Sequence, residues 1–342
     1  MAFLGLCIVL AWGGLSQQSK PERAVLRSLL PSALGTDVRE VIAQEDNASY
    51  SAHYAMQQQE SLARRVAADA ANSAWFQAQR LSFPKFNPTS QDLIIFDVGF
   101  NDGKDTSFYL RMGFHVVGID ANAVLIEEGL VKFKDAIEAG KLALVTAGLE
   151  DGTSLGNMTF WRAQMNAQSS FEKEKACQEW WGGCEPIQIP VRQCQGLWAF
   201  GKPHYIKIDI EERHYCCVNA LRLIRPALRP DFISWEMHEF AKGQPYPMMD
   251  AQLVLNLWRL GYSEVKLVDN GGAEEGTFSG SLPADAIDWA SQSKAWRSTQ
   301  DLIEGGLPDA RKVLDHSDHY HWWDFHMRRA TSDSEHEGGS WK

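Results

Sequence analysis

The feature that most constrains this chain is a series of short, continuously apolar segments that alternate with helical ones. Such apolar runs are typical of parallel strands buried on both faces. The expected strands are residues 93–98, 115–120, 142–145, 205–209, 232–236 and 264–268. The expected helices are residues 105–112, 123–139, 215–224 and 250–260. This alternation predicts an α/β fold, a doubly wound and mostly parallel sheet with helices on both faces.

Acidic residues stand at the ends of four of these expected strands. They are Asp97, Asp120, Asp209 and Glu236. In a doubly wound sheet, ligands bind at the carboxyl ends of the strands. One such acid is ordinarily a helix cap or a turn residue. Four of them on one edge of a sheet indicate a ligand site at that edge.

The turn after the first expected strand reads DVGFNDGKD from residue 97 onward. Gly99 and Gly103 let the backbone pass close to a ligand without side chains in the way. The dinucleotide fingerprint is absent because Asn101 replaces its middle glycine, and Asp105 replaces the Ser or Thr of a phosphate-binding loop. At the end of the next strand, Asp120 suits hydrogen bonding to a ribose diol. A ligand with a ribose but no phosphate fits both observations, and S-adenosylmethionine is such a ligand.

The glycine turn resembles the D-V-G-A-N-x-G turn of the FkbM-type methyltransferases. Residues 205–211 (YIKIDIE) are similar to that family's L-K-I-D-V-E-G segment, and residues 233–236 to its following strand with the final acid. Residues 147–152, followed by 158–161, look like the stretch after the family's third strand. The resemblance covers residues 92–269, in order. It implies a class I methyltransferase fold, which is Rossmann-like, with a seven-stranded sheet that has one antiparallel edge strand. It also implies methyl transfer from S-adenosylmethionine to a hydroxyl oxygen.

Carried over by position, the resemblance gives roles to residues of this chain. The cofactor would be held by the glycine turn, the end of the second strand and the loop after the third: Asp97, Gly99, Phe100, Asn101, Gly103, Asp120, Ala121, Glu150 and Asp151. The residues beside the transferred methyl group would be Lys207, Asp209, Glu211 and His214. An alcohol acceptor needs a base for its proton, and the candidates are Asp209, Glu211, His214 and His238.

One segment departs from the family pattern. The glycine that follows the family's glutamate is Glu212 here, and the family's next acid is His214. Glu212 suits the first turn of a helix, where the dipole favours an acid; alternatively, the acceptor site has changed or activity is lost. His214 titrates near neutrality, which suits a base, whereas the alternative is a solvent-facing residue on the first helical turn.

The two ends of the chain differ from this core. Residues 2–15 are uninterruptedly apolar, shorter than the about 20 residues of a spanning helix, and suit a secretory signal peptide or signal anchor over residues 1–19. The alternative is a buried N-terminal helix. We expect an N-terminal helical extension over 20–90, a methyltransferase catalytic domain over 91–330 and a disordered tail over 331–342. The expected location is therefore the secretory pathway, as a lumenal, secreted or membrane-anchored protein.

An insertion over residues 151–202 should carry extra strands at 158–161 and 187–191. It also holds Cys177, Cys184 and Cys194, between which a local disulfide is plausible in an oxidising compartment. Their spacing does not match a zinc ribbon. The histidine-rich residues 316–326 lack the spacing of a metal motif, so we expect an aromatic segment that packs on the sheet, with a metal site as the alternative.

The charge balance bears on the partners. The 44 acidic residues outnumber the 33 Lys and Arg, which gives a net charge of −11 and argues against a nucleic-acid partner. We expect a small-molecule or glycan acceptor, a sugar hydroxyl being the family-based expectation, and a membrane tether through the apolar N-terminal segment. The oligomeric state is not indicated. A Rossmann oxidoreductase and a non-catalytic secreted or lumenal binding protein on this fold remain the alternatives.

Overall fold

The computed structural model describes residues 48–151, 156–165, 168–179, 182–210, 213–236, 248–269, 296–300 and 323–329. The chain divides into two compact units, residues 1–64 and 65–342, and both sheets belong to the second. The expectations for residues 1–19, for residues 331–342, for Glu211 and for His238 lie outside the described residues. Among the described helices, none combines the length and the apolar character that a membrane crossing requires.

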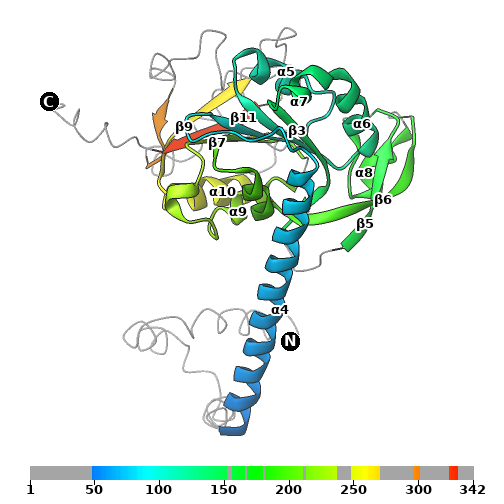
Figure 1. Ribbon diagram of the computed structural model, residues 1–342. Coiled ribbons are helices and arrows are strands. Elements are labelled where there is room, and N and C mark those ends of the chain that lie inside the picture. Colours follow the sequence, from blue (N-terminus) through cyan, green and yellow to red (C-terminus); the bar gives the residue numbers. More distant parts are fainter. Residues whose placement is uncertain are drawn as a thin grey trace, which may run out of the picture. The chain divides into compact units, whose positions relative to one another are not determined.

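One large sheet forms the centre of the second unit (Figure 1). Its strand order is β3 (Leu142–Thr146), β2 (His115–Asp120), β1 (Ile94–Val98), β7 (Pro203–Ile208), β8 (Phe232–Glu236), β11 (Trp323–Arg329) and β9 (Tyr262–Asp269), with the two-residue β10 (Arg297–Ser298) beside β9. The pairs from β3 to β8 are parallel, and β11 is antiparallel to both of its neighbours. This seven-stranded, mostly parallel order with one reversed strand is a class I methyltransferase-like fold, so the expected fold class is confirmed.

The reversed strand β11 is the element that differs most from expectation. It comes from the histidine-rich tail, and it lies between β8 and β9 rather than at the edge of the sheet. Phe325 stacks on Trp235 of β8 at 5.0 Å between ring centroids, and His326 is buried. The tail therefore does pack its aromatic residues against the sheet, as a strand within it. The segment has polar residues among its apolar ones, so it lacks the continuous apolar run that predicts a buried strand.

Helices cover both faces of the sheet (Figure 1). They are α5 (Lys104–Arg111), α6 (Ala123–Lys132), α7 (Lys134–Glu138), α9 (Tyr215–Ala220) and α10 (Met248–Arg259). The helix expected over 123–139 is broken at Phe133, whose backbone leaves the helical region and whose ring packs edge-on against Phe100. Helix α9 ends four residues earlier than expected, and the 3-10 turn η5 (Pro226–Leu228) follows it.

The insertion forms a second, smaller sheet in the order β4 (Gly148–Glu150), β6 (Cys184–Gln193) and β5 (Gly156–Ala163). Helix α8 (Lys173–Ala176) and the 3-10 helix η3 (Cys194–Phe200) flank β6. Both strands expected in the insertion are present. The local disulfide joins Cys177 to Cys184, and a second disulfide joins Cys194 to Cys217 of α9. The insertion is thus tied covalently to the helix that follows β7.

The long helix α4 (Ala48–Leu81) spans much of the expected N-terminal extension. Its last turns belong to the second unit, which begins at Arg65. Phe76 is fully buried in the main core. The Asn72 side chain both donates to and accepts from the backbone of Gln193, at 3.1 and 2.9 Å. These contacts fix the end of α4 against the beginning of η3.

Candidate cofactor-binding site

The four strand-end acids lie at one edge of the large sheet, as the sequence predicted. In the parallel register, Asp97 of β1 is opposite Lys207 of β7. Asp209 follows β7 directly, and the Glu236 side chain at the end of β8 helps to lower the pKa of Asp209. Asp120 ends β2. Neighbouring parallel strands therefore bring these side chains together, although more than a hundred residues separate the first from the last.

Lys207 is the centre of this edge, and its side chain is 7% exposed. Its Nζ lies 2.7 Å from Asp105 Oδ2, 3.1 Å from Asp209 Oδ2 and 3.7 Å from Asp97 Oδ1. Nζ also donates to the Gly99 carbonyl oxygen at 3.4 Å. One ammonium group thus holds three carboxylates and the glycine turn. We call Lys207, Asp97, Asp105 and Asp209 the lysine cluster.

The protonation of the lysine cluster follows from burial and from this charge arrangement. Burial raises the pKa of Asp97 to about 7, although Lys207 opposes that shift, and burial likewise raises the pKa of Asp105. Partial burial disfavours ionised Asp209 too, but the charge of Lys207 and its hydrogen bond hold the pKa of Asp209 below its ordinary value. The three carboxylates keep the pKa of Lys207 well above its usual range in spite of burial. Asp209 and Lys207 are therefore charged at neutral pH.

We expect the Asp97→Asn variant to show how Asp97 couples folding to pH. Thr106 Oγ1 donates to Asp97 Oδ2 at 2.6 Å, and an amide oxygen can accept the same hydrogen bond. The pKa of Asp97 is raised on folding from 3.8 to about 7. Asp97 therefore adds to the free energy of unfolding below about pH 4, and this addition is lost as the pH rises to about 7. The variant should gain free energy of unfolding relative to wild type over that interval. Urea unfolding at a series of pH values measures this difference, and a constant difference would contradict the assignment.

The glycine turn lies between the ends of β1 and β2. Asn101 has a positive φ of 48°, which is unusual for a residue with a side chain, and Gly99 and Gly103 have φ of 90° and 73°. Asp120 accepts hydrogen bonds from the backbone N–H groups of Asn101 and Asn122, both at 2.8 Å. This carboxylate therefore fixes the turn as well as ending the strand. Burial raises the pKa of Asp120.

Two further residues of the expected cofactor set contribute mainly to packing. The ring of Phe100 is buried and lies against three glycines, where a Cβ on any of Gly103, Gly118 or Gly129 would approach it within 3 Å. Ala121 packs on the small apolar cluster of the insertion. Their side chains thus shape the walls of the turn, and the backbone N–H of Phe100 donates to the Ile119 carbonyl oxygen at 2.9 Å.

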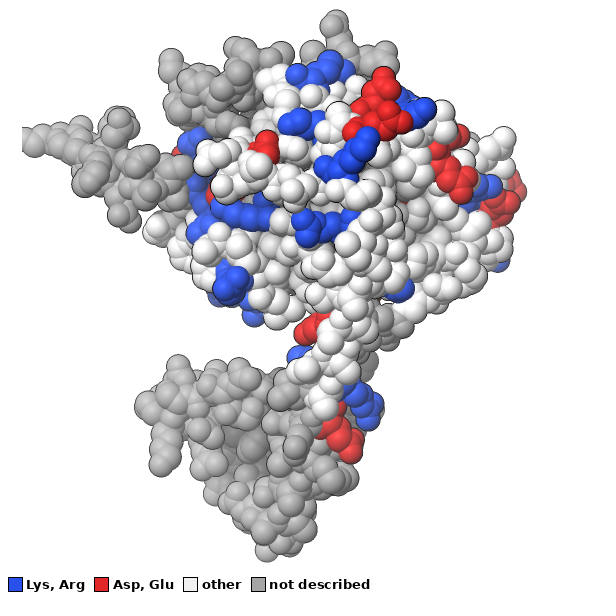
Figure 2. Space-filling view, viewed as in Figure 1, with Lys and Arg blue, Asp and Glu red and all other residues white. Residues whose placement is uncertain are grey.

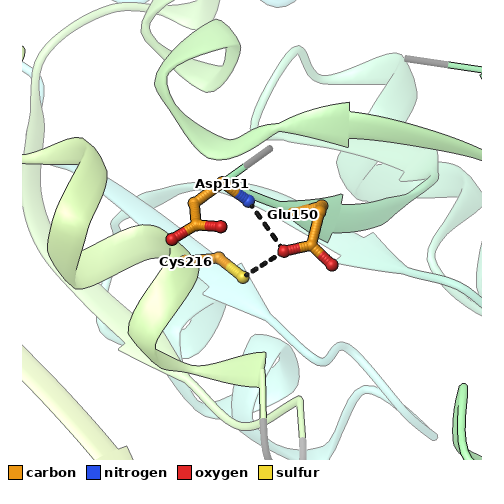
Figure 3. A group of neighbouring side chains, drawn as sticks. All are labelled: Glu150, Asp151 and Cys216. Carbon is orange, nitrogen blue, oxygen red and sulfur yellow. Dashed lines mark hydrogen bonds between the residues drawn. The ribbon is translucent and has the colours of Figure 1, made fainter. Parts of the chain in front are cut away.

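Glu150 and Asp151 lie with Cys216 where β4 meets α9, and the three side chains converge (Figure 3). Cys216 Sγ donates to Glu150 Oε1 at 3.5 Å, and Asn219 donates to Asp151 at 3.2 Å. Arg213 forms an ion pair with Glu150. Burial raises the pKa of the Cys216 thiol, which is the free cysteine of the described part of the chain. A carboxylate that is already paired with an arginine and a protonated thiol are poor metal ligands, so we assign no ion to this group.

His214 is buried, so the solvent-facing alternative is wrong. It stands at the start of α9, and in its protonated form it lowers the pKa of Asp209. Glu211 lies outside the described residues. Sequence analysis missed the roles of Asp105, Thr106 and Arg213. Asp105 and Thr106 follow the glycine turn on the first turn of α5, where an inward-facing polar residue is the signal that could have found them.

A cavity of about 380 Å³ lies at the opposite, amino-terminal edge of the strands. It is lined by Trp198, Lys202, His204 and Asp231 among others. Asp231 is paired with His204 at 2.9 Å and with Lys202 at 3.4 Å. The cavity therefore offers less unbalanced charge than the lysine cluster.

Comparisons with known proteins concern the fold alone. No family model and no curated protein matches the sequence. Among solved structures, it is similar to phospholethanolamine N-methyltransferase 2 of Haemonchus contortus, with a TM-score of 0.33, 11% identity, and coverage of 74% of this chain and 53% of that one. An rRNA methylase of Streptococcus thermophilus has a TM-score of 0.31 and 10% identity over 70% of this chain and 88% of that one. A geranyl diphosphate methyltransferase in complex with SAM has a TM-score of 0.29 and 10% identity over 75% of this chain and 85% of that one. The chain spans about half of the length of the Haemonchus enzyme.

Proposed function

We propose that this protein is an S-adenosylmethionine-dependent methyltransferase of the FkbM type that methylates a hydroxyl oxygen of a sugar or glycan. The observation that supports it best is the lysine cluster beneath a glycine turn, at the carboxyl ends of β1, β2 and β7 in a class I methyltransferase-like sheet. Ligands of doubly wound folds bind at this edge.

The residues present fit that cofactor. Gly99, Asn101 and Gly103 form a tight turn with positive φ at this edge, which suits the methionine end. Each oxygen of Asp120 accepts one backbone N–H and retains a lone pair for a ribose hydroxyl. The lysine cluster has three carboxylates for one ammonium, and this negative balance suits a sulfonium cation.

When bound, S-adenosylmethionine would supply a methyl group on a sulfonium that an oxygen can attack in line. The protein's contribution is to hold the acceptor oxygen on that line and to take its proton. Asp209 is ionised, is 41% exposed, and lies at the strand end where an acceptor would arrive. Lys207 holds that carboxylate in place through a hydrogen bond. We therefore assign the base to Asp209, and we propose that His214 is a neighbouring residue that lowers the pKa of Asp209 when it is protonated.

The Asp209→Asn variant should lose methyl transfer and keep most of its cofactor affinity. The amide cannot take the acceptor's proton, and loss of a general base costs about 10²–10⁴-fold in rate. Transfer from radiolabelled S-adenosylmethionine to a glycan mixture measures the rate, and calorimetry measures the affinity. Turnover at the wild-type rate in this variant would remove Asp209 from the mechanism.

Calorimetric titration of the full chain with S-adenosylmethionine and S-adenosylhomocysteine tests the proposed cofactor. Wild type should bind both, and Asp120→Ala should weaken both by at least about tenfold, because the ribose loses a charge-assisted hydrogen bond. Asp102→Ala is the matched control, since Asp102 is an exposed acid of the glycine turn that Asp120 holds. The absence of binding by wild type would overturn the proposal. Stabilisation by NAD in a thermal-shift assay would instead favour the oxidoreductase, and binding without any transfer would favour the binding protein.

The proposed location is the lumen of the secretory pathway or the cell exterior. Two disulfides, Cys177–Cys184 and Cys194–Cys217, support this location because disulfides persist in oxidising compartments. The apolar residues 2–15 support it as a signal or anchor.

A further inference from the structure

Five arginines meet in one region of a chain whose net charge is −11. Arg222, Arg225 and Arg229 belong to the segment after α9, Arg259 ends α10 and Arg329 ends β11. They come from three separate stretches of sequence, which is why composition showed no basic face.

Two of these arginines hold the backbone of the region in place. The Arg229 guanidinium donates to the carbonyl oxygens of Leu221, Ile224 and Leu260, at 3.0, 3.1 and 3.4 Å, so it joins the ends of α9 and α10. Arg329 donates to the Pro226 carbonyl oxygen at 3.0 Å. The loop over residues 221–229 is therefore fixed from the inside before any partner arrives.

The other three arginines face solvent. Arg222, Arg225 and Arg259 are exposed, and their side chains have no hydrogen bond or ion pair with any residue in the described ranges. The nearby Asp231 is already paired with His204 and Lys202. Figure 2 shows blue atoms and no red ones over the lower left of the larger mass, where α9 and α10 lie in Figure 1. The region thus carries positive charge that no acid of the described chain balances.

Large apolar side chains are exposed among these charges. Leu223, between Arg222 and Arg225, is 70% exposed, and Trp258, beside Arg259, is 39% exposed. Arg229 donates to the backbone carbonyl oxygens of Ile224 and Leu260, so the two segments that carry Leu223 and Trp258 lie close together. Exposed leucine and tryptophan among arginines are typical of surfaces that lie in the headgroup region of a membrane.

We propose that this arginine face, defined as Arg222, Leu223, Arg225, Trp258 and Arg259, binds membranes that contain anionic phospholipids. The arginines pair with lipid phosphates, and Leu223 and Trp258 enter the headgroup layer. A nucleic acid would use the same charges but gives no reason for the exposed leucine. The proposal depends neither on the proposed methyl transfer nor on the proposed location.

Flotation of the full chain with lipid vesicles tests the proposal. The chain should bind vesicles of phosphatidylcholine with phosphatidylserine more strongly than vesicles of phosphatidylcholine alone, and the difference should shrink at high salt. Each lost arginine charge weakens binding by about a factor of five, so Arg222→Glu with Arg225→Glu should reduce binding to the anionic vesicles by at least about 25-fold. Leu223→Ser keeps every charge and should reduce it by about tenfold.

The matched control is Lys85→Glu with Lys134→Glu, which changes the net charge equally. Both lysines are exposed and lie by β3, at the far end of the sheet from β9. This variant should bind like wild type, and unchanged thermal midpoints show that all variants fold. Equal binding of wild type to both vesicle types, or an equal loss in the lysine variant, would overturn the proposal. Arginine-dependent binding of a uridine oligonucleotide, with no preference for anionic vesicles, would also overturn it.

Discussion

Replacing Lys207 by Met is expected to lower the free energy of unfolding at neutral pH by about 3–5 kcal/mol, because it leaves buried carboxylates without their cation. Asp105 and Asp209 lie within 3.1 Å of the Lys207 ammonium, and Asp97 is fully buried beside it. Methionine fills a similar volume, so the loss reports charge rather than a cavity. Urea unfolding monitored by tryptophan fluorescence measures it.

The pH dependence of this loss separates charge from packing. Lys207 lowers the pKa values of Asp97, Asp105 and Asp209, so its removal raises all three in the folded state. Raised carboxyl pKa values give stability at low pH that is lost as the pH rises, so the deficit should be smaller at about pH 5 than at about pH 8. The control is Lys104→Met, which removes an exposed lysine next to the glycine turn. It should change the free energy of unfolding by less than about 1 kcal/mol. A deficit that is the same at both pH values would refute the charge explanation.

Gly99→Ala is expected to cost about 3–5 kcal/mol and to abolish cofactor binding. A Cβ at Gly99 would lie 1.7 Å from the carbonyl oxygen of Asp209, which is backbone and cannot rotate away. The φ of 90° adds the strain of a left-handed residue, about 1–2 kcal/mol. To relieve the collision, β1 and β7 must separate where Asp209 donates its N–H to the Val98 carbonyl oxygen at 2.8 Å. Urea unfolding and calorimetric titration with S-adenosylhomocysteine measure the two effects.

Gly113→Ala is the matched control for this variant. Gly113 has nearly the same φ, 91°, but a Cβ there would have no neighbour within 4 Å. Its loss should be that of backbone strain alone, about 1–2 kcal/mol, with cofactor binding retained. If the two variants lose the same free energy of unfolding, then contact with the backbone of Asp209 is not the reason that residue 99 must be glycine.

The strands and the edge of the site could be predicted because their signals are local. Continuous apolar runs mark β1, β2, β7 and β8, and the acid at the end of each falls on the carboxyl edge of any parallel sheet. The glycine turn was found for the same reason, since Gly99 and Gly103 are adjacent to their strand. Helix ends were predicted less well, because packing of Phe133 rather than local propensity divides α6 from α7.

The remaining features required the tertiary structure. Strand β11 is defined by its pairing with β8 and β9, which are more than fifty residues away in the chain, and its polar residues give no apolar run. The burial of His214 depends on neighbours that sequence spacing does not reveal. Likewise, Cys194 pairs with Cys217 rather than with a cysteine of its own segment.

By itself, the sequence determined the α/β class, the order of the first strands and the edge where charged residues gather. Only the folded chain decided which charges meet there: Asp105 reaches Lys207 from the helix after β1, and Arg213 reaches Glu150 across the insertion. The physical reason is range. Strand and turn preferences act between neighbouring residues, whereas an ion pair depends on two side chains brought within about 4 Å by packing, and that distance is a property of the whole fold.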